Sequence, residues 1–102
     1  MTTTPFQKRV YALLKRVPRG KVTTYGVIAK KLKSSPRAVG QALRVNPFAP
    51  NVPCHRVVKS DGSSGGFRGK TSGRAIKEKI ALLRKEGVEV NENKIKEEFI
   101  KK

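Results

Sequence analysis

The chain has 102 residues, enough for a single compact core, and we predict one small domain over residues 1–102. Its 24 Lys and Arg outnumber seven Asp and Glu, which leaves a formal net charge of +17. No apolar run reaches the ~18 residues of a membrane span, and a single cysteine excludes an internal disulfide and a multi-cysteine zinc site. These features predict a cytoplasmic protein (nucleoid-associated in a prokaryote) with no membrane partner, metal or cofactor, and we expect a monomer.

The positive charge is concentrated in the first three quarters of the chain. Residues 1–77 contain 17 Lys and Arg and one acid, Asp61, whereas residues 78–102 contain seven Lys and Arg and six Glu. A folded domain with this charge repels itself unless an anionic partner compensates, and nucleic acid is the usual partner. The alternative is a charge that serves solubility. Charge and domain size together favour nucleic-acid binding.

Two helices are predicted before residue 35. Thr4 followed by Pro5 is typical of a helix start, and residues 18–20 (Pro-Arg-Gly) are expected to end this first helix. Residues 21–23 form a short extended connector, after which Thr24 can cap a second helix. Helical spacing predicts the buried side chains, which are Phe6, Val10, Leu13, Leu14 and Val17 in the first helix and Ile28, Ala29 and Leu32 in the second.

A third helix is predicted from about Pro36 to Val45, with Val39, Ala42 and Leu43 pointing inward. Its polar face carries Arg37, Gln41 and Arg44. Two short helices joined by a tight break are typical of a helix-turn-helix, whose second helix enters a DNA groove. Spacing alone is equally compatible with an ordinary solvent-facing side, but the surrounding positive charge favours DNA contacts by these three residues.

The second half of the chain contains fewer regular elements. The pattern predicts irregular chain at residues 46–53, a short strand at 57–58 and a Gly- and Ser-rich loop over 62–73. A last helix is expected over 73–86, and residues 88–102 are compatible with a hairpin, a short helix or a frayed end. The fold class is therefore mainly α, a small helix-turn-helix (winged-helix-like) domain with little β-structure.

The ends of the last helix and the glycine-rich loop before it can be predicted in more detail. The last helix should be capped by Ser72 and ended by Gly87, with Ile76, Ile80 and Leu83 buried. Residues 64–71 nearly match a phosphate-binding P-loop, but that motif needs Gly at position 64, and no parallel sheet can be built behind it. The loop is better explained by close approach to a DNA backbone.

Cys54 is the candidate nucleophile. A lone cysteine is usually an inert buried residue, but this one lies between Pro53 and His55, the only histidine, with Arg56 next. Positive surroundings favour the thiolate, which is the reactive form. Adjacent residues in an extended chain point apart, so Cys54 and His55 can cooperate only through a turn or a water. Spacing alone leaves an inert and a reactive thiol both open.

Residues 53–57 (Pro-Cys-His-Arg-Val) resemble the active-site signature of the O6-alkylguanine-DNA alkyltransferases. Residues 20–25 are similar to the start of that family's helix-turn-helix, residues 37–44 with Asn46-Pro47 to its recognition helix and hinge, and residues 82–87 to its closing helix. The resemblance covers about residues 5–88. It implies DNA repair by irreversible, single-turnover transfer of an alkyl group from guanine O6 in double-stranded DNA to the protein's cysteine.

The resemblance also implies roles for individual residues. Cys54 matches the nucleophile, His55 the residue that takes the thiol proton through a water, and Glu86 the carboxylate that orients the histidine. Asn46 matches the hinge asparagine that ties the recognition helix to the active-site turn. Tyr25 matches the tyrosine that helps extrude the nucleotide and hydrogen-bonds the flipped base.

The remaining implied roles concern DNA. Arg37 matches the arginine that enters the duplex where the base was, and Ala38, Gly40 and Ala42 suit a close approach in the minor groove. The O6 group cannot reach a protein thiol from inside the stack, so base flipping must precede transfer. Without the resemblance, Glu86 would be a solvent-facing residue, Tyr25 a half-buried aromatic and Arg37 a phosphate contact.

The chain also departs from the family pattern. Most members carry an extra N-terminal domain that these 102 residues do not contain, and the loop over 67–73 is longer than usual, which leaves open whether Arg68, Thr71 or Ser72 contacts the extruded base. A second hypothesis is a non-enzymatic, alkyltransferase-like module that flags lesions for excision, although such proteins replace the cysteine. A third is a helix-turn-helix regulator with an incidental cysteine.

Overall fold

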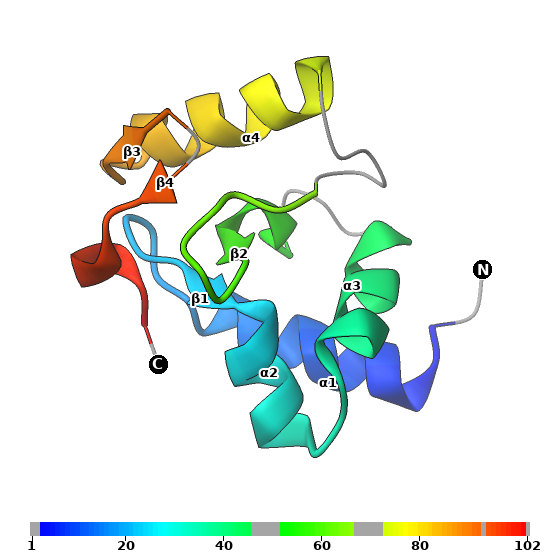
Figure 1. Ribbon diagram of the computed structural model, residues 1–102. Coiled ribbons are helices and arrows are strands. Elements are labelled where there is room, and N and C mark those ends of the chain that lie inside the picture. The colour runs from blue at the N-terminus through cyan, green and yellow to red at the C-terminus, as the bar shows by residue number, and fades with distance from the viewer. Residues whose placement is uncertain (1–2, 46–51, 67–72, 93, 102) are drawn as a thin grey trace.

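Three helices form one half of the molecule (Figure 1). α1 spans Pro5–Lys15, α2 spans Tyr25–Leu32 and α3 spans Pro36–Arg44, in a computed structural model that describes residues 3–45, 52–66, 73–92 and 94–101. The predicted third helix therefore ends one residue early, with Val45 as its C-cap. The helix-turn-helix prediction for this half is confirmed.

Each of these helices begins at a residue whose hydroxyl accepts a backbone N–H. Thr4 accepts from Gln7 while the Gln7 side chain accepts from the Thr4 N–H, a reciprocal capping box with Pro5 in the first turn. Thr24 accepts from the Val27 N–H at 3.0 Å. Ser35 accepts from the Ala38 N–H at 3.1 Å. The two predicted threonine caps are confirmed.

The three helices enclose the first of two apolar clusters. Most of the predicted inward residues are buried there, whereas Phe6, Leu13 and Leu32 are half-buried at its margin. Tyr11 was not predicted to be buried, yet it is 3% exposed and its hydroxyl donates to the Ala42 carbonyl at 2.7 Å. This hydrogen bond ties α1 to α3 across 31 residues of sequence.

A short parallel pair of strands lies between the two halves of the molecule (Figure 1). β1 (Thr23–Thr24) pairs with β2 (Val57–Val58), and a 3₁₀ turn, η1 (Cys54–Arg56), leads directly into β2. Successive side chains of a strand point to opposite faces, so Val57 packs in the first cluster and Val58 in the second. The strand predicted at residues 57–58 is confirmed, and it fixes η1 at the junction of both clusters.

The second cluster lies beneath α4 (Arg74–Lys85) and the C-terminal segment. That segment contains an antiparallel hairpin, β3 (Val90–Asn91) with β4 (Lys94–Ile95), followed by a 3₁₀ turn, η2 (Glu97–Phe99). Backbone hydrogen bonds join it to the connector before β1: Val22 donates to the Phe99 carbonyl at 2.9 Å, and Lys101 donates to the Val22 carbonyl. The segment is thus a hairpin and a short helical turn that complete the core.

α4 departs from its prediction in two ways. Gly73, rather than Ser72, is its N-cap, and no side chain caps it, while Gly87 follows the helix with φ of +91° as expected of a helix stop. Leu83 is fully buried, but Ile76 and Ile80 are only half-buried. The residue that occupies the fully buried position between them is Lys79. Among the described residues, no helix combines the length and apolarity that a membrane crossing requires.

Candidate active site

The η1 turn orients Cys54 and His55 toward different partners. Its first hydrogen bonds run from the Cys54 N–H to the Val52 carbonyl at 2.9 Å and from the Arg56 N–H to the Pro53 carbonyl at 3.0 Å. Cys54 is half-buried against the first cluster, and His55 is 6% exposed. The sequence predicted that Cys54 and His55 can cooperate only through a turn or a water, and η1 is such a turn.

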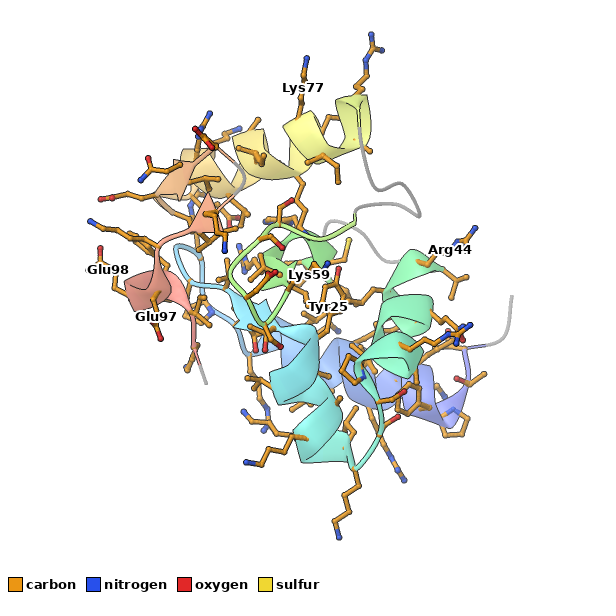
Figure 2. All side chains as sticks on the ribbon, in the orientation of Figure 1. Tyr25, Arg44, Lys59, Lys77, Glu97 and Glu98 are labelled. Carbon is orange, nitrogen blue, oxygen red and sulfur yellow. The ribbon has the colours of Figure 1, made fainter. Side chains whose placement is uncertain are left out.

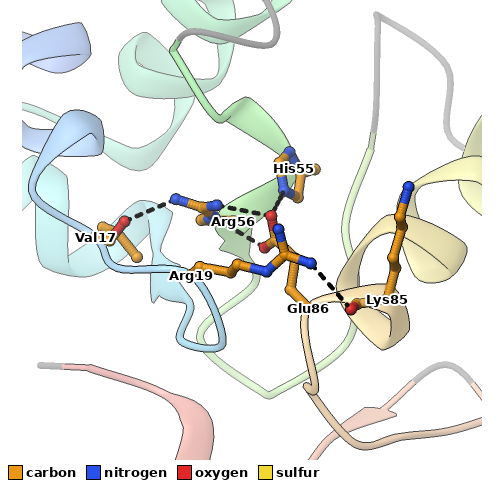
Figure 3. A network of polar contacts seen from close by, with 6 residues as sticks. All are labelled: Val17, Arg19, His55, Arg56, Lys85 and Glu86. Atoms are coloured by element: carbon orange, nitrogen blue, oxygen red, sulfur yellow. Dashed lines mark hydrogen bonds and ion pairs between the residues drawn. The ribbon is translucent and has the colours of Figure 1, made fainter.

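His55 faces a carboxylate that is itself held by an arginine (Figure 3). Nε2 of His55 lies 3.1 Å from Oε2 of Glu86, an ion-pair distance, although the nitrogen has no hydrogen bond of regular geometry to a described residue. Arg56 grips both carboxylate oxygens, from Nε to Oε1 at 2.9 Å and from Nη2 to Oε2 at 2.7 Å. The predicted pair of His55 and Glu86 thus belongs to a triad with Arg56.

Burial and charge set the protonation states of this triad. Burial lowers the pKa of His55, while the interaction with Glu86 partly raises it again. The hydrogen bond from Arg56 lowers the pKa of Glu86, which is therefore ionised at neutral pH. His55 is neutral at that pH, because its pKa lies below the ordinary value of 6.5. A neutral imidazole beside a fixed carboxylate can accept a proton.

A second group of side chains surrounds Cys54 on the α2 and α4 side. Tyr25 is half-buried, and the Nζ of the fully buried Lys79 lies 6.0 Å from the centre of its ring. Burial, and then the negative charge of a Cys54 thiolate, raises the pKa of Tyr25. Burial lowers the pKa of Lys79 to about 8, and the same thiolate opposes that effect. Tyr25 and Lys79 are therefore both within electrostatic reach of the sulfur.

The Lys79 ammonium is held by backbone carbonyls of the segment that follows β2. Nζ donates to the carbonyls of Val57, Ser64 and Gly66. Three acceptors match the three N–H donors of an ammonium group, which explains how a lysine occupies the core. The same segment brings Gly65 against the Tyr25 ring: with φ of +71°, a β-carbon there would lie 3.1 Å from Cε2 of Tyr25.

The outer face of α3 carries the predicted DNA contacts. Arg37, Gln41 and Arg44 are exposed, and Ala38 and Gly40 are half-buried. Ala42, also expected to approach the groove, is instead buried in the first cluster. A β-carbon on Gly40 would meet nothing within 4 Å. Arg44 points away from the body of the protein, and the acidic Glu97 and Glu98 lie on the opposite side in this view (Figure 2). The exposed face of the helix therefore carries positive charge, and its small residues add little side-chain volume.

Some predicted site residues fall outside the described residues, namely Asn46, Arg68, Thr71 and Ser72. Of the others, the structure gathers Cys54, His55, Glu86 and Tyr25 around η1 and places the α3 residues on a separate surface. Sequence reasoning missed Arg56 as the partner of Glu86, and it missed Lys79. Helical spacing held a signal for Lys79, because it lies three residues after Ile76 and four before Leu83.

Comparisons with known proteins agree with this geometry. The family described as 6-O-methylguanine DNA methyltransferase, DNA binding domain, matches residues 5–88. A methylated-DNA–protein-cysteine methyltransferase of Thermococcus kodakarensis is 52% identical over 86 residues, which cover 83% of this chain and 46% of that protein. The chain spans only about one third to somewhat over one half of the length of the curated relatives that it matches.

Two solved structures extend the comparison. The Mycobacterium tuberculosis OGT bound to DNA has a TM-score of 0.74 and 40% identity, covering 84% of this chain and 51% of that one. S. pombe Atl1, in complex with damaged DNA containing O6-carboxymethylguanine, has a TM-score of 0.80 and 32% identity, covering 100% of this chain and 99% of that one. With the family match over residues 5–88, these findings show that the chain belongs to the 6-O-methylguanine DNA methyltransferase family, as a DNA-binding domain.

Proposed function

We propose that this chain repairs DNA by transferring the alkyl group of O6-alkylguanine to Cys54, in a single turnover and as a monomer. The observation that carries the proposal is the half-buried Cys54 on a turn whose next residue, His55, faces the ionised Glu86 at 3.1 Å. A nucleophile, a base and a group that orients the base are the components of an activated thiol. The names of the curated relatives support the same chemistry.

The proposed reaction is a displacement at carbon. The Cys54 proton passes through a water to His55, and the resulting thiolate attacks the alkyl carbon. An S–C bond forms as the C–O6 bond breaks, and the electron pair of that bond stays on the guanine, which takes up a proton at N1 as the ordinary base is restored. The product is a neutral thioether. The chain contains no second cysteine to remove the alkyl group, so each molecule reacts once.

The DNA has to present the lesion outside the base stack. We propose that α3 lies in the minor groove, with Arg37 in the space left by the extruded nucleotide and Gln41 and Arg44 on the backbone. Ala38 and Gly40 allow close approach because they project little beyond the helix. Tyr25 supports the flipped base, since Tyr25 and Cys54 both pack against the first cluster and Tyr25 lies within electrostatic reach of the sulfur. Asn46 is proposed as the hinge between α3 and η1.

Mass spectrometry after reaction tests the transfer. The protein is incubated with a duplex that carries one O6-methylguanine, and the tryptic peptide containing Cys54 is weighed. We expect a methyl group on Cys54 and unmodified guanine in the DNA, in one-to-one amounts. Cys54→Ala should abolish transfer and retain salt-dependent DNA binding. An unmodified cysteine beside tightly bound, still-methylated DNA would overturn the proposal.

One observation favours a second candidate, a module that binds the lesion without transfer. The chain aligns with Atl1 over nearly the full length of both chains, whereas it spans only part of the curated methyltransferases. Cys54 argues for transfer, because binding alone needs no nucleophile. The same experiment separates the two functions: a binding module leaves the methyl group on guanine, while a transferase leaves it on Cys54.

A further inference from the structure

We infer that Arg56 is a positioning residue for alkyl transfer: it fixes the Glu86 carboxylate against His55 and balances the negative charge of that carboxylate beside the histidine. The inference deepens the proposed function and rests on it. Arg56 lies in η1 immediately after His55, so the chain places the base and the arginine in one turn. Their common partner, Glu86, is the C-cap of α4, 30 residues away.

The geometry of Arg56 is that of a clamp between three segments (Figure 3). Two donors hold the two oxygens of Glu86, and Nη1 donates to the Val17 carbonyl at 2.9 Å, just beyond α1. The Arg56 side chain is 16% exposed and that of Glu86 is 11% exposed. Because a bidentate contact restricts the rotation of the carboxylate, it holds Oε2 near Nε2 of His55.

The charge of Arg56 matters because Oε2 serves two partners. Nη2 of Arg56 lies 2.7 Å from this oxygen and Nε2 of His55 lies 3.1 Å from it. A buried carboxylate without a counter-ion would draw a proton onto the histidine, and a protonated imidazole cannot accept the thiol proton. With Arg56 in place, the negative charge is already neutralised. The other charged groups that act on His55 are Lys79 of α4, whose positive charge acts in the same direction as Arg56, and Glu86 itself.

The test uses the only histidine of the chain as its reporter. The imidazole C–H signals of the DNA-free protein are followed by NMR against pH, and no assignment is needed. We expect Arg56→Gln to raise the midpoint of the His55 titration by about one pH unit or more, because a nearby positive charge is lost. Arg56→Lys keeps the charge and should leave the midpoint near that of the native protein.

Single-turnover rates against pH give the second readout. In Arg56→Gln the acid limb of the rate profile should shift to higher pH together with the His55 midpoint. In Arg56→Lys the limb should stay in place while the plateau falls at least several-fold, since one ammonium cannot hold both oxygens of Glu86. A purely structural role predicts lower rates in both variants with no displacement of the limb and no change in the midpoint, and this result would overturn the inference.

A second pair of variants gives an interpretable result even if the loss of Arg56 alone prevents folding. Glu86→Gln removes the buried negative charge, and the double variant Glu86→Gln/Arg56→Gln then leaves no charge in the triad unpaired. Adding Arg56→Gln to Glu86→Gln should raise the His55 midpoint, and an unchanged midpoint contradicts the inference. Because these titrations need no DNA, they remain decisive about Arg56 and His55 even if the native protein fails to transfer methyl groups, which would refute the proposed function instead.

Discussion

Lys79 combines complete burial with a side chain that is charged in most proteins. The cost of removing an ammonium from water is partly offset by its three carbonyl partners, but burial still lowers its pKa to about 8. These partners lie on the segment between β2 and residue 66, which carries Gly65 against Tyr25. Lys79 therefore anchors the segment that packs against Tyr25 beside the site.

The lowered pKa of Lys79 makes the stability of the protein depend on pH. Below pH 8 the lysine is protonated in both folded and unfolded states, and the folded state carries the full burial penalty. Between about pH 8 and 10.5 the unfolded chain binds more protons than the folded one, so the free energy of unfolding rises with pH, by roughly 3 kcal/mol over the whole window. Denaturant titrations between pH 8 and 9.5 should show this rise.

Lys79→Met should flatten the rise, whereas the exposed Lys77→Met should retain it. The difference between the slopes of the Lys79→Met and Lys77→Met proteins isolates the contribution of the buried lysine. Equal slopes for Lys79→Met and the native protein would contradict the assignment.

At the scale of the elements, local signals determined what could be predicted. Thr4 with Pro5 and Thr24 identify two helix starts, because a cap satisfies backbone donors of its own helix and needs no distant partner. The C-terminal segment gave no such signal, since it is held by pairing with Val22, about 78 residues earlier. The structure of this segment depends on the second cluster, whose residues come together from distant parts of the sequence.

The same reasoning explains which site residues were predictable. Cys54, His55 and Glu86 carry the family motif and were identified from it. Arg56 belongs to the same motif, but its partner across 30 residues is a property of the fold. Lys79 was overlooked because its charge marks it as a surface residue, although helical spacing places it on the buried face.

The cap of α3 offers a test at this scale. Ser35 accepts the Ala38 N–H, and Ser35→Ala should lower the free energy of unfolding by about 1 kcal/mol. We also expect weaker binding to duplex DNA, because the first turn of α3 carries Arg37. Ser34→Ala is the matched control and should change stability by less than about 0.5 kcal/mol. Circular dichroism in urea gives the first quantity, and an equal loss in both variants would argue against the cap.

The whole molecule is electrically asymmetric, and this asymmetry orients it. Arg37 and Arg44 are exposed on α3, and Arg44 lies on the opposite side of the view from Glu97 and Glu98 of η2 (Figure 2). Beside η2, Lys96 lies 3.2 Å from Glu89 and 3.8 Å from Glu98. A polyanion is attracted more strongly to the first surface than to the second, where acidic and basic residues nearly balance. We therefore propose that the electrostatic field of the protein turns α3 and η1 toward DNA before any specific contact forms.

This orientation predicts how binding depends on salt. Each phosphate that is neutralised releases condensed counter-ions, so the logarithm of the binding constant falls linearly with the logarithm of salt concentration, by ~0.9 per contact. With Cys54→Ala to prevent turnover, Arg44→Gln should reduce this slope by about one. Lys96→Gln removes the same charge from the far side and should leave the slope unchanged. Fluorescence anisotropy on a labelled duplex measures all three proteins. If the two substitutions reduce the slope equally, net charge alone governs binding and the α3 face is not the interface. Only a phosphate contact made at α3 would make the loss of Arg44 differ from the loss of Lys96.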